Sequence, residues 1–201
     1  MSGGGHKHPR FPAWLSFALT RRGRRREYPP EAIVERLGVR GTHTVLDFGC
    51  GPGFFTVGFA AKARRTVAVD AQHQMLEKAR KRLGPAAANV EFIKTENGTT
   101  LRVASGSIDL AFLAFVYHEL EHPEAVLREL ARTLSPSGRL VIMERTEPGR
   151  ALFQAPQVDP NSVEQEVGRA GFTPRERIRW SRSTLLLFDR PPAKEWVGIE
   201  S

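Results

Sequence analysis

Apolar residues along the central part of the chain follow two alternating patterns. Short runs rich in β-branched residues predict buried strands, and longer stretches with apolar residues every three or four positions predict helices. The predicted strands are Thr44 to Phe48, Thr66 to Val69, Val90 to Ile93, Ile108 to Phe115 and Arg139 to Arg145. The predicted helices are a short one from Glu31 that ends before Gly38, then Phe54 to Ala63, Gln72 to Leu83, Pro123 to Leu134 and Pro160 to Ala170. Strands alternating with helices are typical of a parallel sheet with crossover helices.

The pattern changes near the C-terminus. Arg175 to Trp180 and Thr184 to Phe188 are two strand-like runs joined by too few residues for a crossover helix, so they predict an antiparallel hairpin. Ser135 to Gly138 predicts a turn between a helix and a strand. Asp159 followed by Pro160 predicts a capped helix start.

Length and composition fit one domain. The 201 residues are 40% hydrophobic and 26% charged, as in a globular α/β domain, and no run approaches the ~20 apolar residues that cross a bilayer, so we predict no membrane span. We expect a basic N-terminal arm over residues 1–27, partly disordered or forming a lid, a central domain over residues 28–190 and a tail over residues 191–201.

The net charge of +8 lies mostly at the N-terminus, because residues 1–40 carry nine basic and three acidic side chains. The run from Arg21 to Arg26, with Trp14 and Phe17 before it, leaves open a contact with nucleic-acid phosphates or with an anionic membrane. The single cysteine, Cys50, excludes an internal disulfide and a multi-cysteine zinc site. We predict no metal site and a cytoplasmic location.

The strongest functional signal is a glycine loop where the first predicted strand turns into a helix. Gly49, Gly51 and Gly53 allow a sharp bend and the close approach of a ligand. Asp70 ends the next strand, 21 residues after Gly49, where a carboxylate can bind ribose hydroxyls. The pattern predicts an adenosine-type cofactor; the alternative is a tight turn with Asp70 as a helix cap.

The spacing G-x-G-x-G argues against a nicotinamide dinucleotide. That fingerprint needs a third glycine where this chain has Phe54. Asp47, just before the loop, would repel a pyrophosphate and attract an ammonium or sulfonium group. We therefore expect a cationic cofactor beside Asp47 and the loop.

At these residues the sequence resembles the class I S-adenosylmethionine-dependent methyltransferases, especially their small-molecule branch. Asp47 to Gly53 looks like the first motif of that family and Val69 to Leu76 looks like the second, within a likeness that runs from about Tyr28 to Phe188. The resemblance implies S-adenosyl-L-methionine as cofactor. It also implies an α/β, Rossmann-like seven-stranded and mostly parallel sheet, in the order 3-2-1-4-5-7-6 with strand 7 antiparallel and helices on both faces.

The resemblance implies further cofactor contacts. In the second motif, Ala71 and Met75 would lie at the adenosine, with Met75 packed on adenine. Asn97 and Gly98 are similar to the third motif; Asn97 replaces the usual acidic residue, and its carbonyl would accept a hydrogen bond from the adenine amine.

Residues after the predicted fourth strand are candidates for the site of methyl transfer. Phe115 is expected at the cofactor, and Tyr28 over it as part of a lid, or else as a surface aromatic. His118 and Glu119 are candidate catalytic residues, because open α/β sheets bind ligands at this edge. A base is needed for hydroxyl, phenol or carbon-acid acceptors but not for thiolates. In the alternative, His118 caps the next helix and Glu119 is solvated.

Three functions stay open, of which a methyltransferase acting on a small-molecule acceptor is favoured. One alternative is an RNA or tRNA methyltransferase that uses the basic arm, although Phe115 to Leu120 lacks the Asn/Asp-Pro-Pro-aromatic pattern of amino-methylating nucleic-acid enzymes. The other is a non-catalytic S-adenosylmethionine-binding module. The sequence names neither the acceptor nor the oligomeric state.

Overall fold

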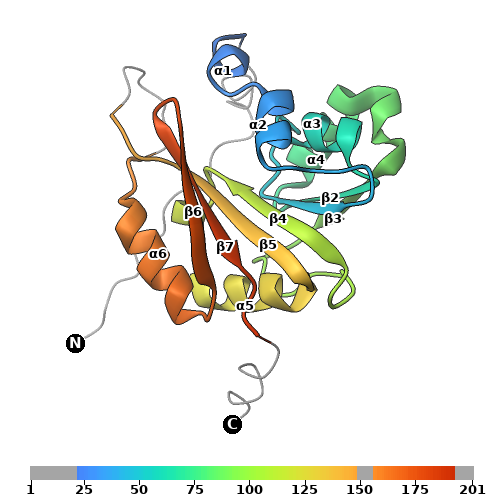
Figure 1. The fold of residues 1–201 in the computed structure, drawn as a ribbon. Coiled ribbons are helices and arrows are strands. Elements are labelled where there is room, and N and C mark those ends of the chain that lie inside the picture. Colours follow the sequence, from blue (N-terminus) through green and yellow to red (C-terminus); the bar gives the residue numbers. More distant parts are fainter. Residues whose placement is uncertain (1–21, 149–155, 193–201) are drawn as a thin grey trace, which may run out of the picture.

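The computed structural model describes residues 22–148 and 156–192, which form one mixed sheet with helices on both faces (Figure 1). The strands are β1 (Thr44–Phe48), β2 (Arg65–Asp70), β3 (Val90–Lys94), β4 (Ile108–Ala114), β5 (Leu134–Arg145), β6 (Thr173–Trp180) and β7 (Ser183–Asp189). Within the described residues their order is β3-β2-β1-β4-β5-β7-β6. Neighbours from β3 to β5 pair in parallel, whereas β7 is antiparallel to β5 and β6. The predicted fold class is confirmed.

Helices cover both faces of this sheet. The helices are α1 (Arg22–Glu27), α2 (Pro30–Arg36), α3 (Thr56–Lys62), α4 (His73–Leu83), α5 (Pro123–Thr133) and α6 (Pro160–Arg169), with short 3₁₀ turns η2 (Gly84–Asn89) and η3 (Tyr117–Glu119). The helices α2, α3 and α4 pack on one face and α5 and α6 on the other. Because both faces are covered, β1 is buried along its whole length, which explains its continuous apolar pattern.

Aromatic packing fixes α3 and therefore the loop that precedes it. Phe112 in β4 is fully buried, and its ring meets the rings of Phe55 and Phe59 edge-on, with centroid distances of 5.3 and 5.2 Å. Burying each of these side chains stabilises the fold by about 1.5 to 3 kcal/mol. The start of α3 is thereby held against the sheet.

The predicted turn at Ser135 to Gly138 is wrong, because these residues belong to β5. The strand begins opposite Ile108, and its register shifts between Ile108 and Leu110, as at a β-bulge. A Cβ at Gly138 would lie 2.8 Å from the carbonyl oxygen of Ile108. The glycine therefore permits a close approach between strands, where the sequence pattern indicated a turn.

The other element predictions are confirmed with shifts of one or two residues at their ends. The C-terminal hairpin is present as β6 and β7. Asp159 caps α6 and accepts a hydrogen bond from the amide of Asn161 at 3.1 Å. Trp14, Phe17 and the rest of residues 1–21 lie outside the described residues, as do 149–155 and 193–201.

Candidate functional site

The loop between β1 and α3 is built around three glycines in the left-handed backbone region, at φ values of +69° for Gly49, +52° for Gly51 and +75° for Gly53. A Cβ at Gly49 would lie 2.4 Å from Cγ2 of Val116, and one at Gly53 would lie 3.0 Å from Cβ of Ala79. Among the described residues, and apart from the two chain neighbours of Gly51, no heavy atom lies within 4 Å of the position of a Cβ at Gly51. The loop is therefore packed at both ends and open at its middle glycine, where a ligand can approach the backbone.

Asp47 lies beneath this loop and is only 2% exposed. It accepts a hydrogen bond from the hydroxyl of Thr56 at 2.6 Å, which ties β1 to the start of α3. Burial raises the pKa of Asp47 to about 7; the bond from Thr56 opposes this shift and the charge of Asp70 adds to it. A carboxyl with this pKa carries less negative charge at neutral pH than an ordinary aspartate, so its contact with a cofactor stays a prediction.

Asp70 ends β2 beside the open glycine. Its Oδ2 accepts the amide of Gly51 and its Oδ1 accepts the amide of Gln72, each at 2.8 Å. Gln72 is the cap residue of α4, so the alternative with Asp70 as the cap is wrong. Ala71 is half-buried and Met75 is buried on α4. The second motif is thereby oriented toward the glycine loop, while its contacts with ribose and adenine stay predictions.

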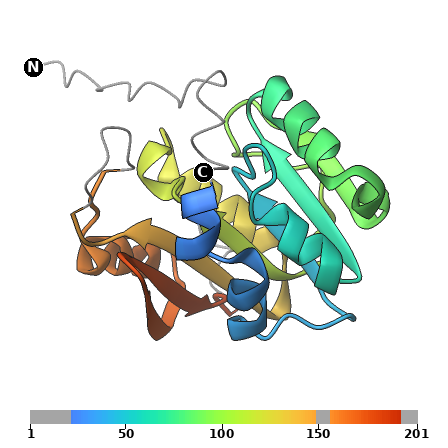
Figure 2. The same ribbon diagram turned by 90° about the horizontal axis from the view of Figure 1, so that it is seen from above.

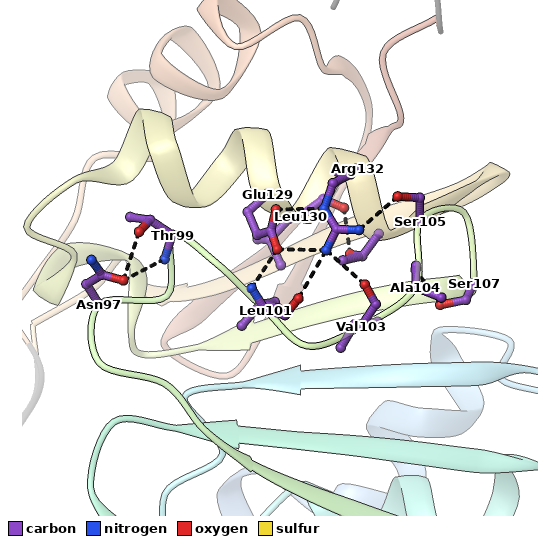
Figure 3. Close-up of polar contacts among 11 residues, drawn as sticks. Asn97, Thr99, Leu101, Val103, Ala104, Ser105, Ser107, Glu129, Leu130 and Arg132 are labelled. Carbon is purple, nitrogen blue, oxygen red and sulfur yellow. Dashed lines mark hydrogen bonds and ion pairs between the residues drawn. The ribbon is translucent and has the colours of Figure 1, made fainter.

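The third-motif residues form a local turn after β3. The side-chain oxygen of Asn97 accepts hydrogen bonds from the amide of Thr99 at 3.1 Å and from its hydroxyl at 2.8 Å (Figure 3). Gly98 has φ +75°, and a Cβ there would lie 2.4 Å from Cζ of Phe48. Gly98 is therefore required for packing. The predicted contact from Asn97 to adenine would share an oxygen that already accepts two hydrogen bonds.

Arg132 on α5 holds the loop between β3 and β4 in place (Figure 3). Its guanidinium donates to the carbonyls of Leu101 at 3.2 Å and Val103 at 2.8 Å, and to the hydroxyl of Ser105 at 2.8 Å. Glu129, one turn earlier, pairs with Arg132 at 2.7 Å and accepts the amide of Leu101 at 2.6 Å. The sequence indicates the pairing of Glu129 with Arg132 by their spacing, but not the loop that they anchor.

The segment that contains Tyr28 is docked onto the C-terminal hairpin. Tyr28 is 2% exposed; its hydroxyl is hydrogen-bonded to that of Ser183 at 3.0 Å, and its ring meets Phe115 edge-on with a centroid distance of 5.4 Å. The indole of Trp180 donates to the carbonyl of Glu27 at 3.1 Å. Figure 2 shows α1 and α2 between the hairpin strands and the helices α3 and α4. The alternative with Tyr28 as a surface aromatic is wrong.

The arginines of the basic run from Arg24 to Arg26 differ in their surroundings. The guanidinium of Arg24 lies over the rings of Phe54 and Phe115, 4.9 and 5.0 Å from their centroids. Burial lowers the pKa of Arg24 to about 10. Arg25 pairs with Glu31 at 2.5 Å on the surface. Arg24 therefore belongs to the site, a placement that its position in a run of arginines did not indicate.

His118 lies in η3, just beyond β4, and is held by a buried carboxylate. Its Nδ1 is 2.9 Å from Oε2 of Glu144 in β5, and its amide donates to Oε1 of Glu144 at 3.4 Å. Its Nε2 is 3.9 Å from Oε1 of Glu119. The cap residue of α5 is His122, so the alternative with His118 as the cap is wrong. Glu144 was not predicted from the sequence, because one acid in an apolar strand gives no periodic signal.

The titration of both candidate catalytic residues is perturbed. Burial by itself lowers the pKa of His118, but the hydrogen bond and charge of Glu144, together with the charge of Glu119, outweigh it and hold the pKa above its ordinary 6.5. Burial also raises the pKa of Glu119; His118 opposes this shift, while Glu144 and Asp70 add to it. Glu119 is therefore half-buried and close to charged groups, contrary to the alternative of a fully solvated side chain.

Cys50 is buried beside Ala68 and Leu76, and burial together with nearby acids raises the pKa of its thiol well above the ordinary value. Its interpretation as a packing residue is confirmed. Among residues 22–148 and 156–192, no three His, Cys, Asp or Glu side chains gather as ligands for a metal ion. No helix in that part of the chain has the length and apolar content to cross a bilayer.

The strand order, the glycine loop and the acid that ends β2 define the class I methyltransferase architecture. Residues 46–142 match the family model described as a methyltransferase domain. The chain thus carries a methyltransferase domain of the S-adenosylmethionine-dependent class, and the resemblance and cofactor predicted from its motifs are confirmed.

Known relatives agree with this assignment. The chain is 34% identical over 125 residues to the ubiquinone/menaquinone biosynthesis C-methyltransferase UbiE of Ectopseudomonas mendocina, a match that covers 60% of this chain and 48% of that protein. It therefore spans about half the length of this relative.

Solved structures share the fold. A SAM-dependent methyltransferase from Aquifex aeolicus superposes with a TM-score of 0.80 at 23% identity, over 89% of this chain and 98% of that one. The 1,6-didemethyltoxoflavin-N1-methyltransferase of Burkholderia thailandensis, solved with 1,6-didemethyltoxoflavin and S-adenosylhomocysteine, superposes with a TM-score of 0.66 at 21% identity, over 89% and 85%.

Proposed function

We propose that this chain transfers the methyl group of S-adenosylmethionine to a small-molecule acceptor at the carboxyl edge of the sheet. The observation that carries the proposal is the open, left-handed Gly51, whose amide is bonded to the carboxylate of Asp70. This arrangement combines a place for close ligand approach with an adjacent carboxylate that can bind ribose hydroxyls. The named activities of the relatives, a C-methyltransferase of ubiquinone/menaquinone biosynthesis and a 1,6-didemethyltoxoflavin-N1-methyltransferase, support a small acceptor.

The amides of the glycine loop fit a sulfonium cofactor better than a dinucleotide. The amides of Gly49 and Cys50 both donate to the carbonyl of Val69, at 2.8 and 2.9 Å, and that of Gly51 donates to Asp70. A pyrophosphate would need such amides as donors. Because these three donate within the protein, the loop is poorly suited to hold a phosphate group.

The residues around this edge can position an acceptor and take up its proton. When bound, S-adenosylmethionine supplies a methyl group already activated by the sulfonium, so the protein contributes mainly orientation and exclusion of water. Tyr28 and Phe115 form an aromatic wall. His118 with Nδ1–H donating to Glu144 presents an Nε2 that can accept a proton from an acceptor hydroxyl.

We also propose that the arm over residues 1–27 closes over the catalytic domain of residues 28–190, with residues 191–201 as a tail. The hydrogen bonds from the β6–β7 hairpin to Glu27, one from Trp180 and one from the hydroxyl of Ser181 at 3.0 Å, support a lid. Arg24 is half-buried against the ring of Phe54, which makes a nucleic-acid grip less favourable, because phosphate contacts need exposed cations. A cytoplasmic location stays a prediction from the sequence.

Calorimetry with S-adenosylhomocysteine and NADH tests the proposal. We expect S-adenosylhomocysteine to bind and NADH not to bind. Asp70→Ala removes hydrogen bonds to a charged acceptor, worth about 1.5 to 3 kcal/mol each, so affinity should fall at least about tenfold. Asp189→Ala is the matched control, because Asp189 pairs with Arg175 on the surface at the opposite edge. Binding of NADH alone would contradict the proposal.

A further inference from the structure

The last residue of β5 is an arginine that the fold buries without a partner. Arg145 is 8% exposed, and both its Nε and its Nη1 are buried with no hydrogen-bond partner among the described residues. Among the residues that the structure describes, no carboxylate forms an ion pair with it. A buried charge without compensation is costly, so such a side chain is rarely kept for stability.

Arg145 lies at the site described above. It is the partner of Ser183 across the β5–β7 ladder, and the hydroxyl of Ser183 is bonded to Tyr28. Side chains alternate along a strand, so Arg145 shares the face of Met143 and Tyr28, while Glu144 points to the opposite face and holds His118. The guanidinium therefore belongs to the carboxyl edge of β5, beneath the segment that we propose as a lid.

Arg24 brings a second positive charge close to Arg145. Nε of Arg24 is also buried without a hydrogen-bond partner, and the positive charge of Arg145 contributes to the lowered pKa of Arg24. Glu27 is the acid of the same helix, but within the described residues it forms no ion pair with either arginine, and it accepts the hydroxyl of Ser181. The charge of Glu27 nevertheless acts on Arg24 and raises its pKa, opposing Arg145. Of the two cations, Arg145 is therefore the one whose charge no acid of the described residues is seen to compensate.

We propose that Arg145 binds an oxyanion of the methyl acceptor, most simply a carboxylate, with Arg24 adding positive charge. The inference rests on the proposed function and narrows its acceptor to small molecules that carry such a group. A guanidinium forms strong, charge-assisted hydrogen bonds to a carboxylate, and the buried Nε and Nη1 of Arg145 are donors that no described group of the protein satisfies. The aromatic wall of Tyr28 and Phe115 would cover the apolar part of the acceptor.

Binding of a charged and a neutral probe tests this inference. Benzoate and benzamide are titrated by calorimetry into protein saturated with S-adenosylhomocysteine. We expect benzoate to bind at least about tenfold more tightly than benzamide, Arg145→Gln to abolish that preference and Arg145→Lys to retain part of it. Arg169→Gln is the matched control, because Arg169 is exposed on α6 and the charge change is the same.

The affinity for S-adenosylhomocysteine separates this inference from the proposed function. If the wild-type chain does not bind S-adenosylhomocysteine, the proposed function fails. If it binds, but Arg145→Gln loses that binding, Arg145 holds the cofactor and the acceptor assignment is overturned. Equal affinity of the wild-type chain for benzoate and benzamide would also overturn it.

Thermal unfolding without ligand gives an independent readout. Arg145→Gln removes an uncompensated buried charge, so its Tm should lie at or above that of the wild-type chain. A structural arginine would behave in the opposite way and lower the Tm. Arg145→Lys, with the charge kept, supplies the binding comparison if the glutamine variant does not fold.

Discussion

Gly51→Ala separates the conformational role of the glycine loop from its role in ligand approach. Gly51 has φ +52°, where an L-residue costs about 1 to 2 kcal/mol. Apart from its chain neighbours, no atom of the residues that the structure describes lies within 4 Å of the new methyl group. The substitution should therefore lower the free energy of unfolding by that conformational cost alone. For a chain of this size it corresponds to a fall in Tm of about 2 to 8 °C. The same methyl group would lie where we propose that the ligand approaches the backbone, so affinity for S-adenosylhomocysteine should fall at least about tenfold.

Two other glycines provide the controls for this substitution. Gly38→Ala has the same conformational cost, since φ is +66° and no described residue beyond its chain neighbours comes within 4 Å of the new methyl group. Gly38 follows α2, away from the loop. Gly49→Ala adds a clash with Val116 and should lose more stability than either, by about 1 to 3 kcal/mol of overpacking. Calorimetry and thermal unfolding are measured on all three variants. If Gly51→Ala binds S-adenosylhomocysteine within about threefold of the wild-type affinity, the loop is not the cofactor site.

For a hydroxyl or phenol acceptor, kcat/KM should rise with pH through a pKa above 6.5, because only neutral His118 accepts a proton. Glu144→Gln should lower that pKa. His118→Ala should slow turnover by about 10² to 10⁴ with unchanged cofactor affinity. A flat pH profile with such an acceptor would eliminate His118 as the base. The folded chain keeps the proton of Asp47 up to about pH 7 while the unfolded chain loses it near 3.8, so stability should fall as pH rises between these values. Urea unfolding of Asp47→Asn should lack this pH dependence; equal dependence in both proteins would refute the buried-acid assignment. Deleting residues 1–26 should weaken retention of S-adenosylhomocysteine or turnover, whereas steeply salt-dependent tRNA binding that is lost on deletion would favour the nucleic-acid alternative.

Local signals predicted most of the fold because the relevant forces act along short stretches of chain. Buried strands such as β1 are apolar on both faces, and the spacing of apolar residues on α5 follows one helical face. The bulged start of β5 was not predicted, because Pro136 and Gly138 give the same local signal in a turn and in an irregular ladder.

The sequence by itself determined the glycine loop and the acid that lies beside it. Glycines at G-x-G-x-G after a strand, with Asp70 at the end of the next, are close in sequence to the elements that place them, so their spacing already encodes their geometry. The residues that we propose around the acceptor come instead from distant parts of the chain. Tyr28 precedes the sheet, His118 follows β4 and Arg145 ends β5.

Only the tertiary structure decided which of these residues share an environment. Glu144 and Arg145 are adjacent in sequence, yet strand alternation sends one to His118 and the other to the side of Tyr28. The pKa of each acid depends on burial and on charges that arrive through strand pairing and helix docking, as the raised value of Asp47 illustrates. Electrostatics and desolvation act through space, so the chemistry of this site could not be predicted from spacing along the chain.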